Sequence, residues 1–143
     1  MLCTGSSNST YDPPLTLASR RTRVSVRAHY TCSVAPGRNV TATGTLDGTS
    51  PSASCLTLGS SARLTEVVRY ADGQQSLIAY GDGATYRVTG AQVLRLTGEV
   101  VEGRGKGQRA QRTVSAASEE LPTECLSSGL DGSSGQAQLE IRP

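Results

Sequence analysis

Hydrophobic and polar residues alternate along several stretches of the chain, most regularly over Thr22–Val34. Every second residue of this stretch is apolar, and the residues between them are mostly Arg, Ser and Thr. A period of two is the pattern of an antiparallel strand with one buried face. The residues predicted to face the core are Val24, Val26, Ala28, Tyr30, Cys32 and Val34.

Shorter runs of the same kind follow, separated by glycine-rich turns, and helix signals are nearly absent. The dipeptide Asp72-Gly73 predicts a hairpin between Arg63–Tyr70 and Gln74–Tyr80, and Asp82-Gly83 predicts a second one within Tyr80–Val88. The chain is therefore predicted to be an all-β domain of about eight antiparallel strands, either a sandwich or a barrel. The remaining strands are predicted at Asn39–Leu46, Gln92–Glu102, Gln108–Ala116 and Ala137–Ile141, with Gln92–Glu102 central and Ser118–Ser134 a long loop.

The segment Ser7–Leu17 contains Pro13 and Pro14. Proline has no N–H to donate to a neighbouring strand, so the segment is predicted to be an edge strand or a polyproline-like extension. If it folds back through residues 18–21, Tyr11 comes opposite residues near Arg27. The same register brings Cys3 close to Cys32.

Four cysteines are spread over the chain, with no Cys-x-x-Cys pair and only one histidine, so no zinc site is predicted. An even, dispersed set points to two disulfides and to an oxidising, extracellular compartment. The fold-back register predicts Cys3–Cys32, and elimination then pairs Cys55 with Cys125. The loop-closure entropy that the disulfides remove from the unfolded chain should stabilise the fold by roughly 3.5 kcal/mol for the first ring and 4.5 kcal/mol for the second. Met1 is interpreted as a start that replaces a cleaved signal peptide.

The 143 residues are interpreted as one secreted domain, 1–143, with a net charge of +2. With five Tyr and no Phe or Trp, the core must be built mainly from Val, Leu, Ala and Ile. Three arginines, Arg21, Arg23 and Arg27, share the polar face of one strand, but no aromatic residue lies between them to stack on a base. No nucleic-acid partner is predicted, and the absence of an apolar span of about 20 residues predicts no membrane partner.

Catalytic patterns are scarce. His29 is the one histidine for a Ser-His-Asp arrangement, and its place on a polar strand face favours a solvated side chain. The carboxylates of Glu119, Glu120 and Glu124 lie in a predicted acidic loop, and Gly103–Arg109 is interpreted as a flexible, positively charged hairpin tip. We therefore predict no catalytic residues, no metal and no cofactor.

Several short motifs resemble those of small secreted four-cysteine β proteins of actinobacteria. The resemblance begins with Cys3-Thr4-Gly5, the run Ser9–Thr16 and Tyr30-Thr31-Cys32, although Pro13-Pro14 stands where the group has Pro-Gly. It continues in Ser54-Cys55-Leu56, Tyr70–Ser76, Leu96–Val100 and Glu124-Cys125-Leu126. Some of these proteins serve as the adaptor subunit of umbrella-shaped antibacterial toxin particles.

The resemblance implies a secreted, non-enzymatic adaptor that joins a trypsin-like lectin to a large repeat-containing toxin. It also implies that residues 3–17 are an extended docking strap, with Tyr11 and Leu15 as apolar anchors. The predicted partner-binding residues are Tyr11, Asp12, Pro13, Pro14 and Leu15. An ordinary edge strand remains the alternative for this segment. For the whole chain the alternatives are an extracellular protease inhibitor and, less favoured, a hydrolase that uses His29.

Overall fold

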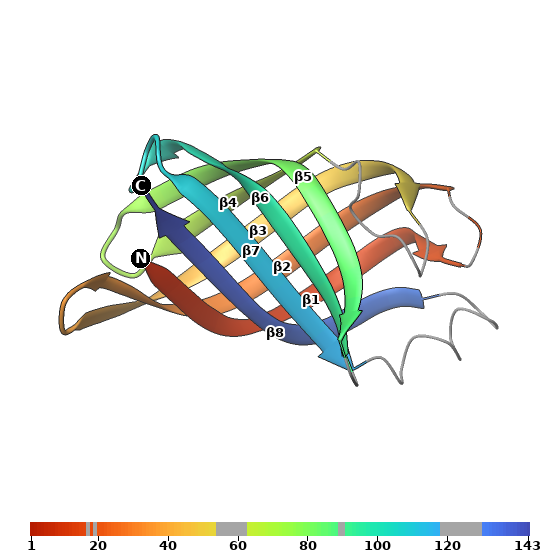
Figure 1. The fold of residues 1–143 in the computed structure, drawn as a ribbon, viewed down its shortest axis with the longest axis horizontal. Coiled ribbons are helices and arrows are strands. Elements are labelled where there is room, and N and C mark those ends of the chain that lie inside the picture. Colours follow the sequence, from red (N-terminus) through yellow and green to blue (C-terminus); the bar gives the residue numbers. More distant parts are fainter. Residues whose placement is uncertain (17, 19, 54–62, 89–90, 118–129) are drawn as a thin grey trace.

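A computed structural model describes residues 1–16, 18, 20–53, 63–88, 91–117 and 130–143. These residues form a closed barrel of eight antiparallel strands, in which each strand pairs with the next and the last pairs with the first (Figure 1). The all-β prediction is confirmed, and of its two alternatives the barrel is the one observed. The strands are β1 (Leu2–Leu15), β2 (Arg20–Ala35), β3 (Arg38–Ala53), β4 (Arg63–Tyr70), β5 (Gln75–Val88), β6 (Ala91–Gly103), β7 (Arg109–Ala117) and β8 (Leu130–Arg142).

Alternation of side chains builds the barrel wall. In β2, the residues from Val24 to Cys32 that were predicted to face the core are buried, and Val34 is half-buried. Arg23 and Arg27, on the other face, are exposed. Because successive side chains of a strand point to opposite faces, one face of β2 fills the barrel and the other meets solvent.

The amino and carboxyl termini lie beside each other at one end of the barrel (Figure 1). The turns β2–β3, β4–β5 and β6–β7 lie at this same end, which we call the turn end. Figure 1 shows that β1 ends and β2 begins at the opposite end.

The predicted pairing of β1 with β2 is confirmed at the two cysteines. Cys3 lies opposite Cys32, and a disulfide with an S–S distance of 2.05 Å joins them. Tyr11 pairs with Val24 rather than with a residue near Arg27. The predicted Cys55–Cys125 disulfide lies outside the described residues.

Three predictions about the strands are corrected. The Asp82-Gly83 hairpin is wrong because β5 continues through this dipeptide and pairs with β6 as far as Val88 opposite Ala91. The register shifts between Tyr80 and Asp82, so Gly81 forms a bulge instead of a reversal. The closing strand begins at Leu130 rather than at Ala137, since β8 pairs with β1 along this stretch.

The third correction concerns β1, which is not an edge strand. It pairs with β2 from Cys3 to Asp12 and with β8 from Leu2 to Thr10. Closure of the barrel gives every strand two neighbours, so the segment has no free edge over this length.

Candidate functional site

The predicted partner-binding segment forms a bulge at the far end of β1. Thr10 pairs with Gly132 and Leu15 pairs with Leu130, so residues 11–14 of β1 lie opposite residue 131 alone. A strand that carries extra residues over one partner bends away from it. We call residues 11–14 the proline bulge.

The side chains of this segment have different environments. Tyr11 is 7 % exposed and belongs to the barrel core, so it does not offer its ring to a partner in this structure. Asp12 is exposed beside Arg23 of β2, and Pro13 and Pro14 are half-buried. The Asp12–Pro13 peptide bond is cis, and the guanidinium of Arg20 donates a hydrogen bond to the carbonyl oxygen of Pro14. The side chain of Leu15 is outside the described part, and partner binding by the segment stays a prediction.

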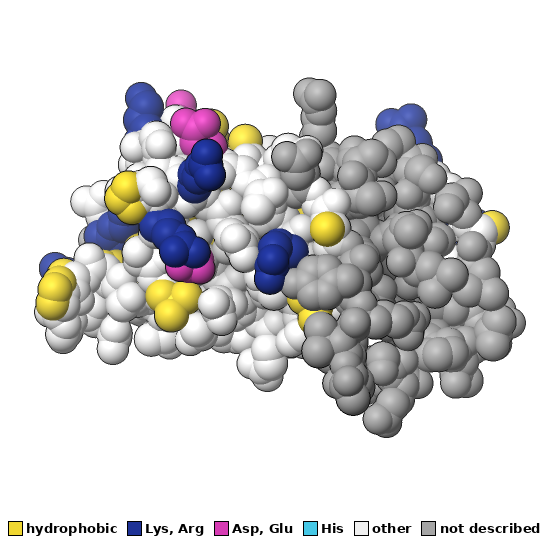
Figure 2. Space-filling view, in the orientation of Figure 1, with side chains coloured by type: hydrophobic (Ala, Val, Ile, Leu, Met, Phe, Trp, Pro, Cys, Tyr) yellow, Lys and Arg dark blue, Asp and Glu magenta, His cyan; other side chains and the backbone are white. Residues whose placement is uncertain are grey.

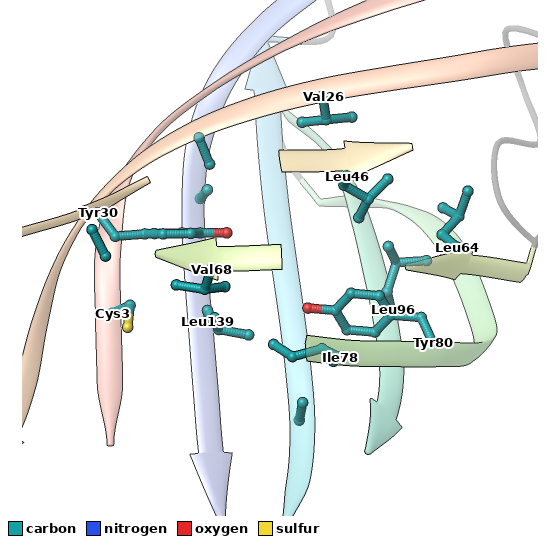
Figure 3. Packing of buried hydrophobic residues seen from close by; sticks show 14 of the residues in the cluster. Cys3, Val26, Tyr30, Leu46, Leu64, Val68, Ile78, Tyr80, Leu96 and Leu139 are labelled. Carbon is teal, nitrogen blue, oxygen red and sulfur yellow. The ribbon is translucent and has the colours of Figure 1, made fainter. Parts of the chain in front are cut away.

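A cluster of polar side chains crosses the barrel interior, and we call it the inner cluster. Its centre is the carboxylate of Glu66 on β4, which is fully buried. The Tyr30 hydroxyl donates to Glu66 Oε2 at 2.9 Å, and the Tyr80 hydroxyl donates to Oε1 at 2.6 Å. Figure 3 shows the two rings entering from opposite sides with their hydroxyl groups directed toward each other.

Arg112 of β7 completes the inner cluster. Its Nε donates to the Tyr30 hydroxyl at 3.1 Å, and Nη2 donates to Ser7 Oγ of β1 at 3.3 Å. Nε also lies 3.6 Å from Glu66 Oε1. Five strands, β1, β2, β4, β5 and β7, therefore meet in one hydrogen-bonded group across the lumen.

Burial and charge set the protonation of this cluster. Burial raises the pKa of Tyr80 well above its ordinary value, and the neighbouring charge of Glu66 raises it further. The pKa of Tyr30 is raised for the same two reasons, although Arg112 opposes the shift. Burial alone would lower the pKa of Arg112, but the carboxylate of Glu66 and the two tyrosines raise it. The ion pair and the neutral hydroxyls thus support one another.

The inner cluster was missed in the sequence, although a signal was present. Glu66 lies between Leu64 and Val68 in the alternation of β4, at an inward position. Arg112 holds the corresponding inward position of β7, between Ala110 and Val114. Two opposite charges on core-facing positions predict a buried pair, because an unpaired buried charge is too costly. Since both carboxylate oxygens bind protein hydroxyls, the arrangement is that of a structural core.

A second group of charged residues lies at the turn end, and we call it the end cluster. The guanidinium of Arg104 lies over the ring of Tyr70, 4.4 Å from its centroid, and its Nη2 binds Asp72 Oδ2 at 2.6 Å. Arg38 lies 3.8 Å from the same oxygen. The Tyr70 hydroxyl binds Ser76 Oγ at 2.8 Å, and Ser76 Oγ donates to the carbonyl oxygen of Arg104 at 2.7 Å.

The end cluster changes the interpretation of Gly103–Arg109. The segment is a hairpin turn, as predicted, with positive φ at Gly103, Gly105 and Gly107, where glycine meets no steric penalty. Arg104, however, is not free in solvent, because it is held between a turn carboxylate and an aromatic face. Its Nη1 is the one buried side-chain nitrogen or oxygen without a hydrogen bond among the described residues.

The remaining candidates from the sequence are His29 and three glutamates. His29 is exposed on the outer face of β2, which agrees with the solvated histidine predicted there. Glu119, Glu120 and Glu124 lie outside the described residues. Over the described ranges, no group of three or more His, Cys, Asp and Glu side chains is placed to hold a metal ion. No helix in this part of the chain is long and apolar enough to cross a membrane.

The described part of the face in Figure 2 offers mixed chemistry. Figure 2 shows basic and acidic side chains interspersed with isolated hydrophobic ones on the described part of one face. Leu2 and Val101 are the large hydrophobic residues that are most exposed in the described part, and they lie on different strands. Comparison of the chain with family models, curated proteins and solved structures finds no match.

Proposed function

We propose that this chain is a secreted, non-enzymatic adaptor that links a lectin-like protein to a large toxin polypeptide. One observation carries the proposal: the chemically versatile side chains of the interior are bound to one another. Glu66 and Arg112, which are the oppositely charged groups of the inner cluster, are almost fully buried and hydrogen-bonded within it. The groups left for recognition lie on the outside of the barrel.

The build of the barrel supports a binding role. A closed sheet cross-linked through its lumen holds its outer surface in one shape, so little conformational entropy is lost when a partner docks. The proline bulge interrupts this regular surface at the end of β1. Its prolines restrict the backbone, and Asp12 supplies an exposed charge.

Secretion is part of the proposal. The Cys3–Cys32 disulfide is of the kind that persists in oxidising compartments and is rare in the cytosol. The second disulfide, Cys55–Cys125, belongs to the proposal as well. Mapping the disulfides of the native protein by peptide mass spectrometry tests both pairings.

The adaptor role is tested by capture from the secreted proteins of the native source. Tagged wild-type protein should retain two further proteins, one lectin-like and one very large, that are identified by mass spectrometry. The variant Asp12→Arg should lose one of them by at least about tenfold, because it reverses a charge in the proline bulge. Glu102→Arg is the matched control, since it makes the same charge change at an exposed position of β6.

Two results would overturn the proposal. The first is wild-type protein that is recovered without any partner. The second is equal capture by Asp12→Arg and wild type, which would remove the bulge as the docking site and leave the adaptor role without a surface.

The protease inhibitor is the second candidate, and the rigid proline-bearing bulge is the feature that favours it. Residues 3–10 of β1 are paired on both sides and cannot enter a protease cleft without breaking the sheet. The bulge alone would have to act as the inhibitory loop. An assay against a panel of serine and cysteine proteases tests this, and no inhibition at micromolar concentration would exclude it.

A further inference from the structure

A groove crosses the outer face of β1, β2, β3 and β4 near the turn end. It has a volume of about 520 Å³. The strand register brings Ser6, His29, Thr43 and Arg69 into one row across it, since each pairs with the next. Their side chains all project outward, because they alternate with the core residues of their strands.

The groove is positively charged without a compensating acid. His29 and Arg69 line the groove, and none of the described lining residues is Asp or Glu. In the part of the chain that the structure describes, neither of these side chains has a hydrogen-bond or ion-pair partner. Two carboxylates lie three residues from Arg69 along the chain. Glu66 is buried in the inner cluster, and Asp72 is bound by Arg104 and lies close to Arg38.

Hydroxyl groups surround the two basic side chains. Thr4, Thr31 and Thr41 form a second row beside the first, in which Thr4 pairs with Thr31 and Thr31 pairs with Thr41. Neighbouring strands are about 4.8 Å apart, so adjacent side chains in a row lie within reach of one small ligand. The groove therefore offers a guanidinium fork, an imidazole and several hydroxyl donors on one face.

We propose that this groove binds a phosphate or sulfate group. A tetrahedral oxyanion accepts several hydrogen bonds at once, and Arg binds such groups with two parallel N–H donors. Hydroxyl and imidazole donors complete this coordination without adding negative charge. The proposal is independent of the adaptor function, because Asp12 and the proline bulge take no part in the groove.

The lining also argues against other ligands. Tyr30 and Tyr70 line the groove, but they are 3 % and 4 % exposed, so they offer no aromatic face for an uncharged sugar ring. Neither of the exposed large hydrophobic residues of the described part, Leu2 and Val101, lines the groove, so it offers no large apolar anchor to a docking partner. An oxyanion, free or carried by a larger molecule, matches the charge and the donors.

Titration followed by amide chemical shifts tests the site. Wild-type protein is titrated with inorganic phosphate, inorganic sulfate and glucose 6-phosphate at constant ionic strength, with chloride as the background anion. We expect saturable shifts that concentrate on residues 4–6, 29–31, 41–43 and 69–71, with dissociation constants in the millimolar range. Stronger binding of glucose 6-phosphate than of phosphate would identify a group carried by a larger molecule, and equal binding would identify the free ion.

Three variants assign the binding to the groove. Arg69→Gln should weaken phosphate binding by about tenfold or more, because it removes the charge and the fork. Arg69→Lys should restore part of the affinity, since it keeps the charge alone. Arg21→Gln is the control, because Arg21 is an exposed arginine of β2 outside the groove, and its loss changes the net charge equally.

The site is overturned by either of two results. One is the absence of saturable shifts with all three probes. The other is an equal loss of affinity in Arg21→Gln and Arg69→Gln, which would show that the anions respond to net charge. All of these positions are on the exposed face of strands, so the variants should fold, and far-UV circular dichroism checks that they do.

Discussion

The inner cluster and the end cluster use the same three kinds of side chain in opposite surroundings. Each combines an arginine, a carboxylate and tyrosine. In the inner cluster the Arg112 side chain is 2 % exposed, and in the end cluster the Arg104 side chain is 23 % exposed. The more exposed pair is the closer one, at 2.6 Å against 3.6 Å for Arg112 and Glu66.

The N···O distance alone therefore does not determine how much an ion pair contributes to stability. At the turn end, where the Arg104 side chain is 23 % exposed, water can replace part of its contact with Asp72, and dissolved salt screens the two charges. In the lumen, Glu66 has only the groups around it to replace water. Loss of the longer but buried contact between Arg112 and Glu66 should therefore lower the free energy of unfolding more than loss of the contact between Arg104 and Asp72.

The two clusters also differ in what they connect. The inner cluster joins five strands across the barrel, whereas the end cluster joins the β4–β5 turn to the β6–β7 turn. Loss of the first should weaken the whole barrel, and loss of the second should loosen one end. Each prediction below tests one side of this contrast.

The largest effect is expected for Arg112→Met. This change leaves the carboxylate of Glu66 buried without its positive partner, which should lower the free energy of unfolding by about 3–5 kcal/mol. Urea unfolding followed by far-UV circular dichroism measures the loss. Arg104→Met is the matched variant at the turn end, and its loss should be clearly smaller.

A second variant separates the charge from the packing. In Glu66→Leu with Arg112→Met, no charge is left buried, so part of the stability should return, although the buried hydroxyls of Tyr30 and Tyr80 lose their acceptor. Equal losses in Arg112→Met and Arg104→Met would contradict the contrast, as would a double variant no more stable than Arg112→Met alone.

The next largest effect is expected for Gly44→Ala. A Cβ atom at Gly44 would overlap Glu66 Oε2 and crowd the Tyr30 ring, so the carboxylate would have to leave its hydrogen bonds. Overpacking of this kind costs about 1–3 kcal/mol. Gly81→Ala is the control, because a Cβ there meets no atom within 4 Å and its φ is not positive. A Gly44→Ala protein as stable as Gly81→Ala would show that the inner cluster can rearrange freely.

The sequence was sufficient wherever local rules decide the outcome. The alternation over Thr22–Val34 predicted the buried face of β2, and the fold-back of the first segment predicted the Cys3–Cys32 disulfide. Both follow from strand periodicity and from the pairing of consecutive strands.

The features that the sequence did not predict depend on contacts between distant parts of the chain. The choice of a barrel over a sandwich depends on β1 meeting β8, which are the first and last strands. The partners of Glu66 come from β2, β5 and β7, and only closure brings them together. Gly103–Arg109 was predicted as a turn, but the burial of Arg104 depends on Tyr70 of another hairpin.

Alkaline pH should separate the tyrosines of the two clusters. Burial raises the pKa values of Tyr30 and Tyr80, and the charge of Glu66 raises them further. Burial also raises the pKa of Tyr70, but Ser76 and Arg104 oppose this upward shift. A raised pKa in the folded state gives stability that is complete below the unfolded value of 10.0 and is lost at higher pH. We expect Tyr70 to ionise first, and Tyr30 and Tyr80 only as the barrel unfolds.

Tyrosinate absorbance and far-UV circular dichroism, recorded in one titration, check this order. The variant Tyr70→Phe should remove the earliest of the shifted ionisations and leave the late step in place. Ionisation of all five tyrosines near the ordinary value with the strand signal intact would contradict the burial of the inner cluster.

The smallest effect is expected for Asp72→Asn at the turn end. The hydrogen bond from Arg104 lowers the pKa of Asp72 below its ordinary value of 3.8. A lowered pKa in the folded state gives stability that is present above the unfolded value and is lost as the pH falls through the folded value. Wild type should therefore be slightly more stable than Asp72→Asn at about pH 7, and the difference should vanish in strong acid.

Thermal unfolding of the two proteins across this pH range, in low and in high salt, measures the difference. High salt should reduce it at neutral pH, because the end cluster is open to solvent. If the difference persisted in strong acid and in high salt, the charge of Asp72 would not be its source. Asp72 would then act by holding the turn that places Arg104 on Tyr70, and the end cluster would stabilise the barrel through packing rather than through charge.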